Sequence, residues 1–194
     1  MTAINLNLEP LVEELNHEQF YKLCMANKDI AMERSSAGKL IIMSPVGGES
    51  GRQEANYIID LGIWNRQTGL GEVFNSSTIF NLPNGGDRSP DAAWVQSERW
   101  NALTPEQRTK FPPICPDFVI ELRSQSDRLK PLQEKMKEYL DSGLRLGFLI
   151  NPQGKTVEIY RAGQTVEVMQ FPTTVSGEDV LPGFSLTIEE KKIY

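Results

Sequence analysis

Two acidic side chains, in segments that are predicted to form neighbouring strands, have the chemistry of a metal site. Asp91 follows Ser89-Pro90 at the start of a predicted strand, and Glu121 lies in the segment PDFVIELRS, which is predicted to form the next strand. If these strands pair, the two carboxylates can jointly hold a divalent cation. Oxygen ligands of this kind suit Mg²⁺ or Mn²⁺, which keep several waters and bind substrate phosphate. Such a cation would neutralise charge that develops on a phosphodiester and would activate an attacking water.

Arg123 lies two residues after Glu121 on the same strand and adds a positive charge to this pattern. Residues i and i+2 face the same side of a strand, about 6.6 Å apart, so both side chains can reach one point. A guanidinium placed there would stabilise the same developing charge. The alternative is structural: Asp91 caps a turn, and Glu121 forms an ordinary ion pair with Arg123.

A second basic candidate lies on the helix predicted over residues 127–142. Lys135 and Tyr139 are four residues apart and therefore share one helix face. The segment from Arg123 to Lys137 has five basic and two acidic residues, an excess that suits phosphate contacts. The alternative is an amphipathic helix with a solvated lysine and a tyrosine at the edge of the core.

Other residues that could do chemistry are less informative. Glu49, before the first long predicted helix, is a candidate third carboxylate or a surface turn residue, and Ser50 is interpreted as the N-cap of that helix. His17, the single histidine, falls in a predicted N-terminal helix, so a Ser-His-Asp hydrolase has little support. The glycine pairs lack the spacing of phosphate-binding loops, and no nucleotide cofactor is expected.

The hydrophobic pattern predicts the elements that must position these residues. Helices are expected at 15–26, 51–68 and 127–142, together with a short capped helix at TPEQ. Strands are expected at 72–82, 91–95, 117–123 and 146–150, with hairpins formed by 30–34 with 39–43 and by 156–160 with 166–170. The middle of the chain therefore reads helix, three strands, helix, strand. This order is typical of an α/β fold with helices packed on a sheet.

Composition restricts the class of protein. The 194 residues suit one domain spanning 1–194, and a hydrophobic share of 39% with 24% charged residues is that of an ordinary globular protein. No apolar run approaches the roughly 20 residues of a membrane span, and the start lacks a secretory pattern, so a cytoplasmic protein without a membrane partner is expected. Cys24 and Cys115 are interpreted as reduced thiols. The net charge of −6 argues against a large nonspecific nucleic-acid surface but permits a local basic groove.

Most of the chain resembles the Uma-type family of restriction-endonuclease-like proteins, within the PD-(D/E)XK nuclease superfamily. The resemblance runs through LIIMSPVGGESG, LGEVFNSSTIFNLPNGGDRSPDAAWV, FPPICPDFVIELRSQSDRLKPLQEKMKEYLDSGLRLGFLINP, VEIY and SGEDVLPGF. It implies a restriction-endonuclease-like core of helix, three strands, helix and strand, here with an N-terminal helix and hairpin and a C-terminal hairpin. It also implies a Mg²⁺ or Mn²⁺ site at Asp91 and Glu121, and an acidic residue at the position of Glu49.

The chain departs from the superfamily pattern at Arg123, where that pattern has a lysine. Lysine can lose its proton when it is desolvated, whereas arginine effectively cannot. A general base at this position would therefore be impaired, whereas a charge-stabilising group would not. Related nuclease families carry Gln-x-x-x-Tyr on the matching helix, and Lys135-x-x-x-Tyr139 is similar to it.

These observations support one leading hypothesis and two rivals. The first is a metal-dependent endonuclease that acts on DNA, with RNA as the alternative substrate, in which Arg123 and Lys135 stabilise charge. A homodimer is expected in this case, because enzymes that cut both strands of a duplex often form dimers. The second is a noncatalytic module that binds nucleic acid or protein on a nuclease scaffold. The third is an assembly protein that dimerises through a sheet edge.

Overall fold

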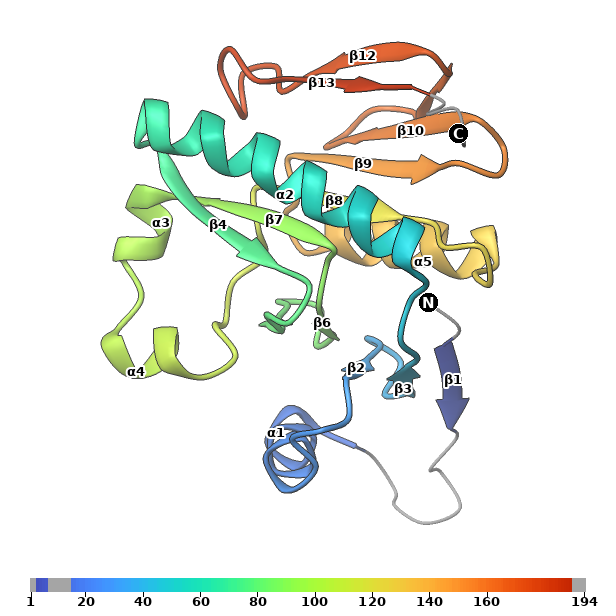
Figure 1. The fold of residues 1–194 in the computed structure, drawn as a ribbon. Coiled ribbons are helices and arrows are strands. Elements are labelled where there is room, and N and C mark those ends of the chain that lie inside the picture. Colours follow the sequence, from blue (N-terminus) through green and yellow to red (C-terminus); the bar gives the residue numbers. More distant parts are fainter. Residues whose placement is uncertain (1–2, 7–14, 190–194) are drawn as a thin grey trace.

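A computed structural model describes residues 3–6 and 15–189 and consists of a central mixed sheet, two long helices and a smaller N-terminal sheet (Figure 1). The elements are, in order, β1 (Ala3–Leu6), α1 (His17–Ala26), β2 (Met32–Arg34), β3 (Leu40–Met43), α2 (Gly48–Thr68), β4 (Gly71–Asn75), β5 (Phe80–Asn81), β6 (Asp87–Arg88), β7 (Ala92–Gln96), α3 (Ser97–Asn101), α4 (Pro105–Thr109), β8 (Phe118–Leu122), α5 (Leu129–Asp141), β9 (Leu146–Asn151), β10 (Thr156–Arg161), β11 (Glu167–Gln170), β12 (Thr173–Ser176) and β13 (Ser185–Ile188). None of the helices in these ranges is both long and apolar enough to cross a membrane.

The central sheet has the strand order β11-β10-β9-β8-β7-β4. Strands β8 and β9 are parallel, and the other neighbours are antiparallel. Parallel neighbours need a crossover connection, and α5 supplies it between β8 and β9. The predicted order of helix, three strands, helix and strand corresponds to α2, β4, β7, β8, α5 and β9, so the mixed α/β class is confirmed.

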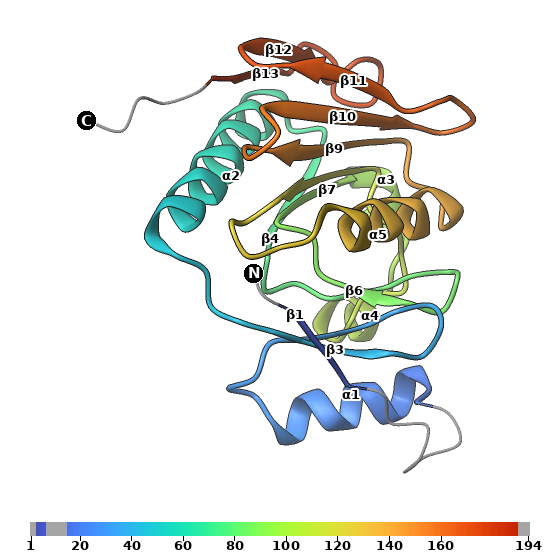
Figure 2. The same cartoon turned by 90° about the vertical axis from the view of Figure 1, so that its right-hand side faces the viewer.

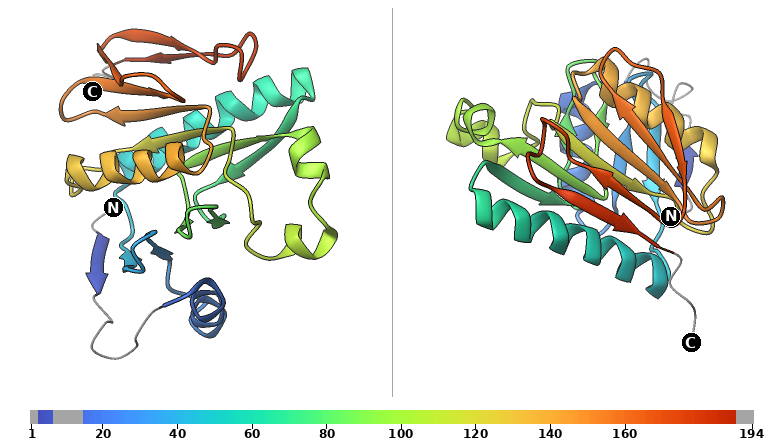
Figure 3. Two further views of the ribbon diagram at one scale, coloured as in Figure 1. Left: turned by 180° about the vertical axis from the view of Figure 1, so that it is seen from behind. Right: turned by 90° about the horizontal axis from the view of Figure 1, so that it is seen from above.

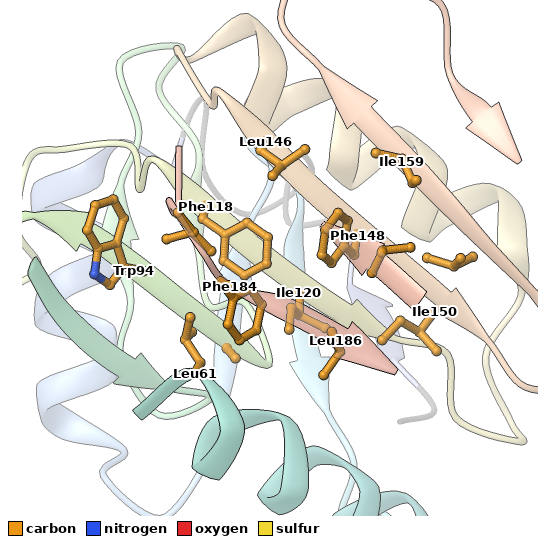
Figure 4. Packing of buried hydrophobic residues seen from close by; sticks show 14 of the residues in the cluster. Leu61, Trp94, Phe118, Ile120, Leu146, Phe148, Ile150, Ile159, Phe184 and Leu186 are labelled. Carbon is orange, nitrogen blue, oxygen red and sulfur yellow. The ribbon is translucent and has the colours of Figure 1, made fainter. Parts of the chain in front are cut away.

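The two faces of this sheet bury separate apolar layers, and Figures 2 and 3 show α2 and α5 on opposite sides of it. On the α2 side, Phe118 and Ile120 of β8 pack in a cluster with Leu61 of α2, with Leu186 of β13 and with Phe184 just before β13 (Figure 4). On the α5 side, Val119 of the same strand packs with residues of α5. The predicted alternation along β8 is confirmed, and it places Glu121 on the α5 side.

The N-terminal sheet has the order β1-β3-β2-β6-β5 and contains the predicted hairpin of β2 and β3. Strands β1, β2 and β3 of this sheet precede α2 in the sequence, whereas β5 and β6 follow it. The two groups join where Arg34 of β2 pairs with Asp87 of β6. Helix α1 begins after Asn16, whose side chain accepts a hydrogen bond from the Gln19 N–H in a capping box. The hairpin of β10 and β11 and the capped helix α4 are also as predicted.

The structure corrects two predictions of local structure and adds elements that were not predicted. The strand expected over 72–82 is divided, because an Asx turn at Asn75 directs β4 to the central sheet and β5 to the N-terminal sheet. Helix α2 begins at Gly48 with Gly47 as its N-cap, so Ser50 lies inside the helix. Helix α3 and the pair β12–β13 were not predicted, because α3 has five residues and each strand has four, which is too short for a periodic pattern to identify them.

Candidate active site

The pairing of β7 with β8 brings Asp91 and Glu121 together. In the antiparallel register Ala92 lies opposite Ile120, so the next step along the ladder places Asp91 opposite Glu121. Residues directly opposite each other in an antiparallel pair point to the same face. Both carboxylates line one cavity of about 630 Å³. The structure therefore contains the pairing of β7 with β8 that a joint site of Asp91 and Glu121 requires.

Glu121 lines this cavity and has only 2% of its surface exposed. Its Oε1 atom is 2.8 Å from the Nζ atom of Lys135 and accepts a hydrogen bond of 3.0 Å from the Tyr139 hydroxyl. Burial raises the pKa of Glu121, and the nearby Glu33 adds to this, although Lys135 opposes both effects. Two groups on α5 thus fix one oxygen of this carboxylate.

Asp91 is held by the backbone of the neighbouring strand. Its Oδ2 atom accepts a hydrogen bond of 2.7 Å from the Leu122 N–H. Burial is the main cause that raises the pKa of Asp91 well above its usual value, and the charge of Glu121 is the next. Two carboxyl groups with raised pKa values at one cavity are a typical sign of a functional site.

Lys135 is buried in the middle of the site, with 5% of its surface exposed, rather than solvated. Its ammonium group contacts Glu121, Glu33 at 2.8 Å and the carbonyl oxygen of Ser89 at 2.9 Å. Burial alone would lower the pKa of Lys135, but the charges of Glu121, Glu33 and Asp91 outweigh it and raise this pKa. Lys135 is therefore a fixed positive charge at neutral pH. Tyr139 is fully buried and not at the core boundary.

The N-terminal sheet contributes two charged residues that the sequence analysis did not single out. Glu33 of β2 and Arg88 of β6 are both buried, and they form an ion pair of 2.9 Å. Arg88 also contacts Glu138 of α5 at 2.8 Å. Because charged residues in short strands are usually solvated, the sequence held no signal that these two line the cavity.

Two of the predicted site residues do not join this group. The Arg123 guanidinium donates to the Asn151 side chain at 3.1 Å and to the Asp127 carbonyl, and Arg123 is not among the described residues that line the cavity. Glu49 is exposed and pairs with Arg52 on the outside of α2. The α2 carboxylate that lines the cavity is Glu54, which accepts a hydrogen bond from Ser76 and contributes to the raised pKa of Asp91.

The charges of the cavity suit a divalent cation. Seven carboxylates and four basic side chains line it, so it is negative as a whole. In the described parts of the chain, no three His, Cys, Asp or Glu side chains gather as one metal cluster. Mg²⁺ is commonly bound by only one or two carboxylates, with water completing its coordination, so Asp91 and Glu121 form a sufficient donor set. Burial raises the pKa of both groups in spite of the nearby Lys135 charge, so a bound cation would favour their ionised forms.

Comparison with known proteins shows the family of this chain and a fold that it shares with a solved structure. The chain belongs to the Uma2 family, described as "Putative restriction endonuclease", whose model matches residues 17–189. One similar solved structure is the crystal structure of "a putative nuclease belonging to DUF820" from Anabaena variabilis, with a TM-score of 0.69 and 20% identity. The match covers 81% of this chain and 87% of that one, and at this identity it shows a shared fold. A search of curated proteins finds no match.

Proposed function

We propose that this protein is a metal-dependent endonuclease that hydrolyses phosphodiester bonds, with DNA as the main substrate and RNA as the alternative. The observation that carries the proposal is the pair of buried carboxylates, Asp91 and Glu121, at one cavity beside the Lys135 ammonium. Membership of the Uma2 family supports the same class of reaction.

Asp91 and Glu121 would hold the Mg²⁺ or Mn²⁺ ion. When bound, this cation would neutralise charge on the phosphodiester and favour ionisation of the attacking water. Glu54 of α2 lines the same cavity and is a candidate to orient water or a hydrated cation. Lys135 holds the Glu121 oxygen in place and supplies a positive charge where negative charge increases during the reaction.

Arg123 has no direct part in this proposal. Its guanidinium ties the end of β8 to Asn151 of β9 and to the loop before α5, which carries Asp127. The departure from lysine at this position is then compatible with activity, because Lys135 reaches the same carboxylate from the helix.

A nuclease assay with point variants tests the proposal. Supercoiled plasmid, single-stranded DNA and RNA would be incubated with the protein in Mg²⁺, Mn²⁺ or chelator. We expect cleavage only with a cation, and a loss of at least about 100-fold in Asp91→Ala and Glu121→Ala. Glu106→Ala, which removes an exposed glutamate of α4, is the matched control and should cleave normally. Equal cleavage by Glu121→Ala and Glu106→Ala would refute the assignment.

The noncatalytic binding module is the second candidate, because of one observation. The contacts of Lys135 with Glu33, Glu121 and the Ser89 carbonyl occupy all three protons of its ammonium group. A scaffold protein that had lost the reaction could keep such a closed network. Cation-dependent binding of nucleic acid without cleavage, on every substrate in the panel, would favour this candidate.

A further inference from the structure

The cavity is built from two parts of the molecule, and one buried glutamate connects them. Asp91, Glu121 and Lys135 belong to the central sheet and α5, whereas Glu33 belongs to β2 of the N-terminal sheet. Glu33 has 1% of its surface exposed and lines the same cavity. Figure 2 shows the N-terminal sheet and α5 as adjacent layers.

The contacts of Glu33 are divided between its two oxygens. Oε1 lies 2.8 Å from the Lys135 Nζ atom and accepts a hydrogen bond of 2.9 Å from the Ser89 N–H. Oε2 accepts a hydrogen bond of 2.9 Å from Arg88. Glu33 therefore contacts Lys135 directly and is held in position by a rigid backbone group and a buried guanidinium.

These contacts fix where the Lys135 charge lies. A lysine side chain has four rotatable bonds, and each acceptor that its ammonium contacts restricts the positions it can take. Glu121 holds it from β8, the Ser89 carbonyl from the segment before β7, and Glu33 from β2. Without Glu33, two of the three acceptors remain, and neither lies on the N-terminal sheet.

We infer that Glu33 is a positioning residue for Lys135, so that the N-terminal sheet completes the active site rather than merely covering it. Glu33 acts through Lys135 and is not expected to contact substrate or cation. The inference of a catalytic effect rests on the proposed nuclease function, whereas the inference of positioning does not.

A double-mutant cycle tests the catalytic part. Glu33→Gln, which keeps the size of the side chain but removes its charge, is expected to lower the single-turnover cleavage rate about 10- to 100-fold, as do losses of supporting partners in other sites. In a Lys135→Met background, the same change should have almost no further effect on this rate, because the residue through which Glu33 acts is gone. Equal losses in both backgrounds would overturn the inference.

Glu158→Gln is the matched control. Glu158 of β10 is also a buried glutamate, and it contacts α5 through Gln133, but it does not line the cavity. We expect it to alter thermal stability without lowering the cleavage rate, and rates would be compared at a temperature where all variants are folded. A loss of rate in Glu158→Gln equal to that in Glu33→Gln would show a general effect of buried charge and would also overturn the inference.

A crystal structure of Glu33→Gln gives a readout that needs no activity. In Glu33→Gln we expect the Lys135 Nζ atom to leave hydrogen-bond distance of residue 33 and to shift toward Glu121, whereas in Glu158→Gln it should keep its wild-type position. If Nζ in Glu33→Gln stays within about 3.2 Å of residue 33 at its wild-type position, the positioning role is refuted. If Glu33→Gln does not fold, Glu33→Asp, which keeps the charge but is one methylene shorter, replaces it with the same expectations. A wild-type protein that cleaves nothing would contradict the proposed function, while this structure would still decide the role of Glu33.

Discussion

The site combines three carboxyl groups, Glu33, Asp91 and Glu121, with two buried cations, Arg88 and Lys135. Both cations contact Glu33, and their charges lower the pKa of that carboxyl even though burial alone would raise it. Asp91 lies at the other end, where burial and Glu121 dominate and raise its pKa. This unequal distribution leaves Asp91 as the group that gains most from a bound cation.

Replacing Asp91 by asparagine should stabilise the protein in the absence of divalent cations. The raised pKa of Asp91 means that the folded state binds a proton at this group more tightly than the unfolded state does. The stability that protonated Asp91 contributes is therefore complete below the unfolded pKa, near 3.8. It is lost as the pH rises through the folded pKa. An asparagine side chain does not titrate, and its oxygen can still accept the hydrogen bond from the Leu122 N–H. We expect the variant to exceed the wild type by about 1.4 kcal/mol for each unit of pKa difference.

Urea unfolding in chelator between pH 4 and pH 8 measures this difference. The advantage of Asp91→Asn should grow with pH and vanish near the acidic end of the range. Added Mn²⁺ should stabilise the wild type and leave the variant unchanged. A stability difference that does not depend on pH would contradict the raised pKa of Asp91.

Lys135 and Arg123 should differ sharply when each is changed to methionine. Lys135→Met leaves Glu121 and Glu33 without their shared cation, so we expect cleavage to fall about 100-fold or more. Arg123→Met removes contacts with Asn151 and Asp127, so we expect a cost of about 1 kcal/mol in unfolding free energy with less than about a fivefold change in rate. Single-turnover kinetics and urea unfolding of both variants measure the two effects, and a larger loss of rate for Arg123→Met would return the charge-stabilising role to that residue.

At the level of the elements, the site depends on how α2 is joined to the edge of the central sheet. Helix α2 carries Glu54, and β4 follows it after the left-handed Gly69. At Gly71 the two elements meet β7 so closely that a Cβ atom would lie 2.3 Å from the Val95 carbonyl oxygen. Asn65 completes the junction, with its side chain accepting hydrogen bonds from the Gly71 N–H and the Trp94 indole.

Gly71→Ala should therefore be strongly destabilising. The added methyl group would overlap a backbone oxygen and the Trp94 ring, and neither can move without separating β4 from β7. We expect a loss of about 3 kcal/mol in unfolding free energy. Thermal and urea unfolding would measure it, with Gly62→Ala in the middle of α2, where a Cβ has open space, as the control that should not destabilise. Equal stability of the two variants would contradict this packing.

At the level of the whole molecule, the net negative charge of the protein should make its binding of nucleic acid depend on divalent cations. The chain has a net charge of −6, and the cavity itself contains more carboxylates than basic groups. A phosphate backbone is repelled from such a surface unless bound cations reverse its charge. The excess of basic residues between Arg123 and Lys137 does not overcome this repulsion, because the charge of Lys135 is balanced by its ion pairs with Glu33 and Glu121.

Nucleic-acid binding, and not only cleavage, should therefore need a divalent cation. Fluorescence anisotropy with labelled DNA in Ca²⁺ or in chelator, at matched ionic strength, measures this requirement. We expect binding to be at least about tenfold weaker in chelator. Equal affinity in the two conditions would place the nucleic-acid surface away from the cavity.

The sequence by itself was enough to predict the order of helices and strands in the core and the alternation along β8, and it identified Asp91 and Glu121 as a pair on the condition that their strands are neighbours. These features arise from local periodicity and from residues adjacent to strand ends, so they are visible along the chain. The predictions for Arg123 and Glu49 show the limit, since spacing gives the face of a strand or helix but not the partner that a long side chain contacts.

The tertiary structure decided which charges share the cavity. Glu33, Glu54 and Arg88 come from separate elements, and only the packing of the N-terminal sheet against α5 brings Glu33 and Arg88 to Lys135 and Glu138. Burial then sets their protonation, because the cost of an ionised group depends on which countercharges lie within a few ångströms of it. No pattern along the chain contains that information, since it depends on contacts between residues that are up to about a hundred positions apart.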